Sequence, residues 1–221
     1  IGHIGLPGGG YGTYGSINAM GGDAPLLGGP SLPLGDNQVQ PFIPCARIAD
    51  LLLRPGETFR YNGGTHTYPA IRLVYWAGGN PFHHHQDLNR LLRAWQRPQT
   101  IVVHEQVWNA HAKMADIVLP ASATTEREDI AASPRNALLV AMKRIDAPPG
   151  QARDDHAIFS DLAAHLGVQP AFTLGRSTTD WLRAMWTDWR GRALQAGLGE
   201  VPDFDAFWQA GAYEMPRSAA R

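Results

Sequence analysis

The stretch that decides the fold is IRLVYWAGGNPFHHHQDLNRLLRAWQRPQTIVVHE, residues Ile71–Glu105. It begins with a run of β-branched and aromatic residues, Ile71–Ala77, which is typical of a buried strand. Apolar side chains then recur at helical spacing after Asp87, a residue type that favours helix N-caps. A second apolar run, Thr100–His104, completes the pattern. The stretch predicts a β-α-β unit in which a helix connects two parallel strands.

The alternation of strands and helices extends to both sides of this stretch. Downstream, Asn109–Ala115 is predicted to be a short helix, and Ile117–Leu119 a third strand that ends at Pro120. Upstream, Ala46–Leu53 predicts a helix, and the turn sequence at 62–64 indicates a hairpin. The predicted fold class is therefore α/β, with an open, mostly parallel sheet flanked by helices.

The pattern is less regular after Asp129. Asp154 or Asp155 can cap a helix that ends at Gly167. A further amphipathic helix has one apolar face, which we expect to pack in a core rather than to form a ligand site: Leu182, Met185, Trp186 and Trp189.

We divide the chain into three expected segments. Residues 1–45 are rich in glycine and proline, and their apolar side chains favour a long, shaped loop over a solvated tail, although a tail stays possible. Residues 46–170 contain the predicted parallel sheet. Residues 171–221 are expected to be a helical extension.

Composition narrows the class of protein. The chain has 221 residues, 44% hydrophobic and 18% charged, with a formal net charge of −1, so nothing favours nucleic acid or an anionic membrane as a partner. The single cysteine, Cys45, excludes an internal disulfide. No apolar run is long enough to predict a membrane span. Because the chain begins at Ile1 without a signal peptide pattern, we expect an internal fragment of a longer polypeptide.

The loop Gly78-Gly79-Asn80-Pro81 joins the first predicted strand to its helix. Ligands of open parallel sheets gather beyond the carboxyl ends of the strands, and two glycines allow a close backbone approach. Glu105, at the end of the next strand, lies 25 residues beyond Asn80. His104 or Glu105 is thus suitably spaced to hold ribose hydroxyls. A tight turn without any ligand stays an equal alternative.

Two other clusters do not indicate a reaction centre. The consecutive histidines at 83–85 cannot all face one metal ion, because neighbouring side chains diverge in direction. We expect one of them to donate a hydrogen bond to a ligand instead. The charged run Glu126–Asp129 is more typical of a solvated, ion-paired turn than of paired catalytic carboxylates. The sequence therefore assigns no catalytic residue and no metal ligand.

Several long motifs, in the same order, resemble one enzyme family. These are WAGGNPFHHHQDLNRLLRAWQRPQTIVVHE (Trp76–Glu105), AKMADIVLPASATTERED (Ala112–Asp129), ARDDHAIFSDLAAHLG (Ala152–Gly167) and the opening IGHIGLPGGGYGTYG (Ile1–Gly15). Together they resemble the molybdopterin oxidoreductases that reduce dimethyl sulfoxide, trimethylamine N-oxide or biotin sulfoxide.

The resemblance implies a modified dinucleotide-binding, Rossmann-like domain. Such a domain holds one guanine dinucleotide arm of the Mo-bis(molybdopterin guanine dinucleotide) cofactor, and segment 1–45 would line the cofactor. Asp116 is expected to brace the region. By position in the matching motifs, the cofactor-binding residues are Gly9, Gly10, Gly79, Asn80, His84, His104, Glu105 and Asp116.

The resemblance also implies what lies outside this chain. A molybdenum-ligating serine and a C-terminal domain that clasps the cofactor are expected elsewhere in the polypeptide, so the isolated fragment should be inactive and lack the cofactor. The expected partners are those remaining domains, a small-molecule oxide and an electron donor. The segment after Glu126-Arg127 departs from the family pattern and is shorter, so no cofactor or substrate-channel contact is transferred to residues around 130–137.

Two other classes stay open. The chain can belong to a formate dehydrogenase or nitrate reductase type of molybdopterin enzyme, or it can be a stand-alone nucleotide-binding module. The likeness to biotin sulfoxide reductase indicates a cytoplasmic location, with the periplasm as the alternative.

Overall fold

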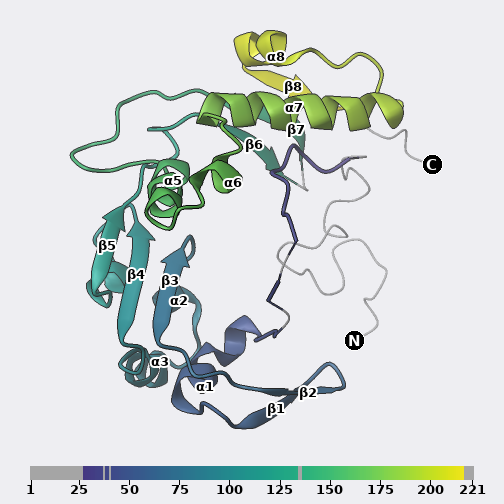
Figure 1. Ribbon diagram of the computed structural model, residues 1–221. Helices are drawn as coiled ribbons and strands as arrows, with labels where there is room; N and C mark the ends of the chain where they lie inside the picture. Colours follow the sequence, from purple (N-terminus) through teal and green to yellow (C-terminus); the bar gives the residue numbers. More distant parts are fainter. Residues whose placement is uncertain (1–26, 37, 40, 134–135, 217–221) are drawn as a thin grey trace, which may run out of the picture. The chain divides into compact units, whose positions relative to one another are not determined.

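The computed structural model describes residues 27–36, 38, 39, 41–133 and 136–216, and these form two compact units (Figure 1). The parallel-sheet unit comprises Leu34–Glu126 and Asp146–Leu174. The antiparallel-sheet unit comprises the described parts of 1–33, 127–145 and 175–221. The predicted cofactor contacts Gly9 and Gly10 lie outside the described residues.

The parallel-sheet unit is built on three parallel strands in the order β3-β4-β5. Their register pairs Ala77 with His104 and Glu105 with Pro120, so the three carboxyl ends open at the same edge. The predicted parallel strands are confirmed, within two residues at each end: β3 (Leu73–Ala77), β4 (Thr100–Glu105) and β5 (Ile117–Pro120).

Helices connect these strands, and side chains cap their N-termini. The Asn80 side chain accepts from the backbone N–H of Phe82, Asp87 accepts from Arg90, and Asn109 accepts from Ala112. These bonds satisfy backbone donors that a helix start leaves without partners. The predicted cap at Asp87 is confirmed, and the connecting helices are α2 (Pro81–His84), α3 (Leu88–Trp95) and α4 (Ala110–Lys113).

The two faces of β4 are covered by different elements. Ile101 and Val103 belong to a buried cluster with Leu91, Ala94 and Trp95 of α3. Because successive strand residues point to opposite faces, Val102 and His104 face the other way. On that side lies α5 (Asp155–His165), which α6 (Gln169–Thr173) follows. This alternation places the two predicted ligand contacts of β4 on different faces.

A hairpin and a short helix complete the unit. The hairpin turns at Asn62 and Gly63, which both have positive φ (46° and 77°), as the predicted turn requires. The predicted helix near Ala46–Leu53 is also confirmed, as a 3-10 turn followed by a helix. The elements are η2 (Cys45–Arg47), α1 (Ile48–Leu53), β1 (Thr58–Tyr61) and β2 (Gly64–Thr67).

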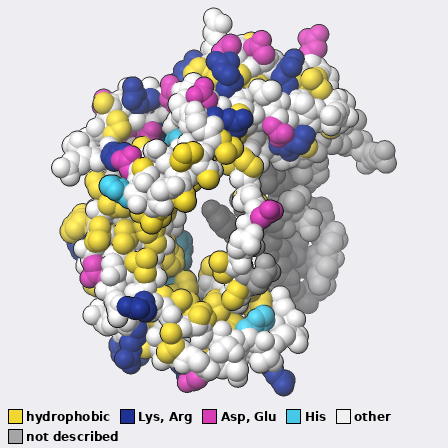
Figure 2. Space-filling view, viewed as in Figure 1, with side chains coloured by type: hydrophobic (Ala, Val, Ile, Leu, Met, Phe, Trp, Pro, Cys, Tyr) yellow, Lys and Arg dark blue, Asp and Glu magenta, His cyan; other side chains and the backbone are white. Residues whose placement is uncertain are grey.

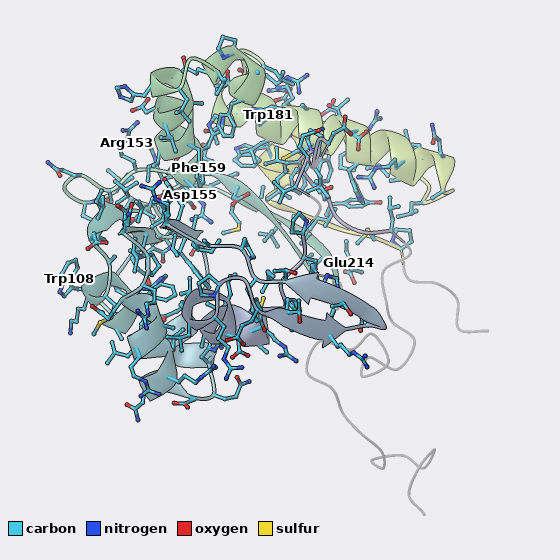
Figure 3. All side chains as sticks on the ribbon, turned by 60° about the horizontal axis from the view of Figure 1, so that its bottom comes forward. Trp108, Arg153, Asp155, Phe159, Trp181 and Glu214 are labelled. Atoms are coloured by element: carbon cyan, nitrogen blue, oxygen red, sulfur yellow. The ribbon has the colours of Figure 1, made fainter. Side chains whose placement is uncertain are left out.

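The surface over β5 is apolar in part. Figure 2 shows hydrophobic side chains gathered over this strand, where Ile117 is 47% exposed. Trp108 and Val107, in the loop after β4, are also exposed, and Trp108 is labelled in Figure 3. Exposed apolar side chains in such number are typical of a surface that other parts of a protein cover.

The antiparallel-sheet unit packs a long helix on three strands. Trp186 and Trp189 of α7 are fully buried, and Trp186 stacks on Phe207 with ring centroids 3.6 Å apart. This confirms the prediction that these tryptophans pack in a core. No helix in the described part of the chain is both long and apolar enough to span a membrane. The elements are β6 (Asp129–Ser133), β7 (Asn136–Met142), α7 (Thr178–Gln195), α8 (Phe204–Ala210) and β8 (Ala212–Glu214).

Candidate functional site

The candidate site is the carboxyl edge of the β3-β4-β5 sheet. The loops that follow Ala77, Glu105 and Pro120 all leave the sheet at this edge. Gly79, Asn80, His104 and Glu105, four of the predicted contacts, lie on or beside it. Neighbouring backbone groups and strand-end side chains converge at such an edge, which is where open parallel sheets bind ligands.

The glycine turn after β3 leaves open space beside the backbone. Gly78 and Gly79 have φ of +83° and +73°, a region that favours glycine. A Cβ at Gly78 would meet nothing within 4 Å, and one at Gly79 would meet only the indole nitrogen of Trp76 at 3.9 Å. That indole N–H donates to the Gly78 carbonyl at 2.7 Å and fixes the turn. A ligand can therefore approach the backbone here closely.

Asn80 presents a buried donor. Its Oδ1 accepts from the backbone N–H of Phe82 at 3.0 Å, which orients the amide. The Nδ2 atom is buried and has no hydrogen-bond partner among the described residues. A buried N–H₂ group without a partner is costly, so an acceptor from a ligand would satisfy a donor that the fold already holds in place.

His84 lies on α2 beside the same loop. Its side chain is exposed, as is that of His83. Both can reach solvent and a ligand without rearrangement of the core.

His104 is committed to contacts within the protein. It is 5% exposed, with Nε2 2.7 Å from the Tyr75 hydroxyl and Nδ1 2.6 Å from Oδ1 of Asp155. The ring of Phe159 stacks on it with centroids 4.9 Å apart. Since both ring nitrogens are engaged, His104 has no free polar atom to offer a ligand.

Glu105 faces the opposite side of β4. Asn109 Nδ2 donates to its Oε2, and the backbone N–H of Gln106 donates to its Oε1 at 3.3 Å. The side chain is 15% exposed. A carboxylate oxygen has more than one lone pair, so this fixed group can still accept hydrogen bonds from a ligand. Of the two residues that the sequence left open, Glu105 is the one with accepting capacity to spare.

Asp116 lies at the other edge of the sheet. Its Oδ2 accepts from the backbone N–H of Ile101 at 2.8 Å, and its own N–H donates to the Ile101 carbonyl at 3.0 Å. Ile101 is near the amino end of β4, and Asp116 directly precedes β5. Asp116 therefore braces two strands and is separated from the carboxyl edge by the length of β4.

His111 is a buried residue that the sequence did not single out. It is fully buried, and neither ring nitrogen has a hydrogen-bond partner among the described residues. The aromatic rings of Trp76, Phe82 and Trp95 surround it. Burial lowers its pKa, while the negative charge of Glu105 acts in the opposite direction. No local sequence signal distinguishes this histidine, because its surroundings come from three separate elements.

A family model described as molybdopterin oxidoreductase matches residues 1–165 of this chain. The chain belongs to the molybdopterin oxidoreductase family. The match covers all three strands of the parallel sheet and the whole of α5. The resemblance that the sequence motifs indicate is thereby confirmed, and the family implies a molybdenum–molybdopterin cofactor.

Curated relatives in this family are named as S-oxide and N-oxide reductases. The chain is 47% identical to biotin sulfoxide reductase of Cereibacter sphaeroides and 42% identical to the dimethyl sulfoxide/trimethylamine N-oxide reductase of the same organism, each over 98% of this chain. It is 40% identical to trimethylamine-N-oxide reductase of Haemophilus influenzae over 94% of this chain. The chain spans 27–29% of the length of these relatives.

A solved structure has the same fold. The likeness to acetylene hydratase from Pelobacter acetylenicus has a TM-score of 0.50 at 17% identity, and it covers 68% of this chain and 19% of that one. At this identity the likeness concerns the fold alone.

The residues at the carboxyl edge offer polar groups that can hold an anionic ligand. The unpartnered Nδ2 of Asn80 can donate to a phosphate or hydroxyl oxygen, and the open glycine turn admits a bulky anionic group. Glu105 supplies acceptors for donor groups on a base or a ribose. Donors and acceptors are thus both present at one edge.

Proposed function

We propose that the carboxyl edge of the parallel sheet binds the guanosine diphosphate arm of a Mo-bis(molybdopterin guanine dinucleotide) cofactor. The observation that supports this most directly is the buried Nδ2 of Asn80, which has no partner among the described residues and follows an open glycine turn. The proposal takes the parallel-sheet unit as a Rossmann-like domain, in which the nucleotide lies beyond the strand ends; the parallel order β3-β4-β5 supports it.

Each residue has a separate part in this proposal. Asn80 donates to a phosphate oxygen, while Gly78 and Gly79 let the backbone come close to it. His84, exposed on α2, is available to donate to the same anionic group. Glu105 accepts from the N1–H and the exocyclic amino group of guanine, since a carboxylate offers two oxygens to two neighbouring donors. Gly9 and Gly10 would line the pterin.

The whole protein is proposed to be an S-oxide or N-oxide reductase, as its relatives are named. When bound, the molybdenum cofactor supplies oxygen-atom transfer. This chain's residues bind and orient the cofactor. The rest of the polypeptide, a small oxide substrate and an electron donor are the proposed partners. The named relatives favour this class over a formate dehydrogenase, a nitrate reductase or a stand-alone module.

Asn80→Asp provides a sharp test. Aspartate keeps the oxygen that caps α2 but replaces the Nδ2 donor by an acceptor and adds negative charge beside the phosphate. We expect the dissociation constant of the 221-residue chain for GDP, measured by calorimetry, to rise about tenfold or more, as for the loss of a hydrogen bond to a charged group. In the full-length enzyme, molybdenum and guanine nucleotide per protein should both fall.

Asn89→Asp is the matched control, because it makes the same chemical change on the exposed surface of α3. It should leave GDP affinity and cofactor content unchanged. His84→Ala should weaken GDP binding by a smaller factor than Asn80→Asp. If Asn80→Asp and Asn89→Asp behaved alike, or if GDP did not bind the unaltered chain, the proposed site would be wrong.

A further inference from the structure

Tyr75, His104 and Asp155 form a chain of two hydrogen bonds that links three elements. Tyr75 is on β3, His104 is on β4, and Asp155 is the first residue of α5. The two bonds measure 2.7 Å and 2.6 Å. We call these three residues the His104 network. His104 is not one of the proposed nucleotide contacts. The network therefore needs a separate explanation.

The partners of His104 select one form of its ring. A carboxylate oxygen of Asp155 can only accept, so Nδ1 carries a hydrogen. Burial, followed by the negative charge of Asp155, raises the pKa of Tyr75, so the phenol keeps its proton. The Tyr75 hydroxyl, which can both donate and accept, bonds to Nε2 at 2.7 Å. The network thus fixes a hydrogen on Nδ1 and a hydroxyl partner at Nε2.

The same network fixes the start of α5. Phe159 follows Asp155 by one turn and stacks on the His104 ring, and both come from α5 (Figure 3). A second bond, from Ser122 Oγ to Asp154 at 2.7 Å, joins the start of α5 to the loop after β5. Two neighbouring carboxylates therefore tie one helix end to the carboxyl edge of the sheet.

We propose that the His104 network is a positioning device for the nucleotide site. His104 and Glu105 are consecutive on β4 and point to opposite faces. By holding the end of the strand from the α5 face, His104 keeps Glu105 at the orientation that the nucleotide requires on the α4 face. His104 is thus a positioning residue rather than a ligand contact. This inference rests on the proposed function.

The tautomer of His104 is the first readout. In the ¹⁵N-labelled 221-residue chain, the ring nitrogens of His104 should show a hydrogen on Nδ1. Tyr75→Phe removes the hydroxyl and keeps the ring, and Asp155→Asn removes the charge. Each should shift His104 toward a mixture of tautomers. An unprotonated Nδ1 in the unaltered chain, or no change in the ring-nitrogen signals of either variant, would overturn the network.

Asp161→Asn is the matched control. Asp161 lies on the same helix, and its carboxylate pairs with Arg153 at 2.7 Å on the exposed surface. Removing this charge should leave the His104 tautomer and the GDP affinity unchanged. An equal effect of Asp161→Asn and Asp155→Asn would show that only the charge of α5 matters, which contradicts the proposal.

GDP binding is the second readout. Tyr75→Phe and Asp155→Asn should each raise the dissociation constant roughly fivefold to tenfold, about the effect of one lost hydrogen bond. Both substitutions act through His104. The double variant should therefore have about the same dissociation constant for GDP as the single variant that binds GDP less tightly. GDP binding that is normal in both variants overturns the positioning role alone. Absence of GDP binding in the unaltered chain overturns the proposed function as well, while the tautomer still reports on the network.

Discussion

The Nδ1 atom of His111 lies 3.9 Å from Oε2 of Glu105, and the imidazole is fully buried. The distance is too long for a hydrogen bond. The surrounding indole and phenyl rings offer the imidazole no compensating charge. The site therefore contains a carboxylate beside a buried histidine whose pKa is lowered by burial.

The stability of the chain should decrease in mild acid because of His111. Burial lowers its folded-state pKa, whereas the unfolded chain has a histidine pKa of about 6.5. As the pH falls through about 6.5, the unfolded state takes up a proton that the folded state does not, so the free energy of unfolding falls. His111→Phe should reduce this pH dependence in urea titrations. The exposed His83→Gln should not, and an equal slope in all three proteins would contradict the assignment.

Asp116 should matter for stability and not for the nucleotide. Asp116→Ala removes the acceptor for the backbone N–H of Ile101. The free energy of unfolding should fall by about 1–3 kcal/mol, the cost of leaving a part-buried donor unsatisfied. The affinity for GDP should stay the same because Asp116 is at the amino edge of the sheet. A large loss of GDP affinity in a folded Asp116→Ala chain would place the ligand elsewhere.

Glu105 should determine the choice of base. Guanine presents two neighbouring donors to a carboxylate, and adenine does not. Glu105→Gln replaces one acceptor with a donor, so the preference for GDP over ADP should fall by about tenfold or more. Competition calorimetry with the two nucleotides measures this ratio. Gln106→Glu, which places a carboxylate one residue further along, should not restore the preference in the Glu105→Gln background.

Substitution by alanine should change the stability of the chain in opposite directions at two glycines. Gly79 has φ of +73°, so Gly79→Ala should lower stability by about 1–2 kcal/mol and also weaken GDP binding. Gly191 lies inside α7 with nothing within 4 Å of an added Cβ. Gly191→Ala should raise stability by about 0.5–1 kcal/mol and leave GDP binding unchanged. Chemical denaturation of both variants checks the pair.

The sequence predicted the parallel-sheet unit well because its signals are local. Strand runs, the cap at Asp87 and the turn at Asn62–Gly63 each depend on a few neighbouring residues. Asp154 or Asp155 was expected to cap a helix, and α5 does begin there. Their carboxylates bond to Ser122 and His104 instead of to the helix. A sequence pattern cannot reveal such partners, since they lie 32 and 51 residues away.

The antiparallel sheet was not predicted. β8 has three residues and pairs with β7, where Leu138 lies opposite Glu214. The sequence of β7, Asn136–Met142, is apolar without alternating polar residues, and its pairing with β8 joins residues that are far apart in the chain. In the candidate site, Asn80 and either His104 or Glu105 were predicted as contacts, and the structure locates all three at the carboxyl edge of the sheet. Tyr75, His111 and Phe159 were not predicted, because only the packed structure brings them to the same edge.

The position of β4 in the sheet has an evolutionary consequence. His104 and Glu105 are neighbours in sequence, yet one belongs to the contacts that hold a helix and the other to the surface proposed for the nucleotide. A shift of one residue in the pairing of β4 would exchange their faces. A substitution within β4 changes one side chain and leaves the faces of the others as they are. An inserted or deleted residue within the strand would remove both roles at once.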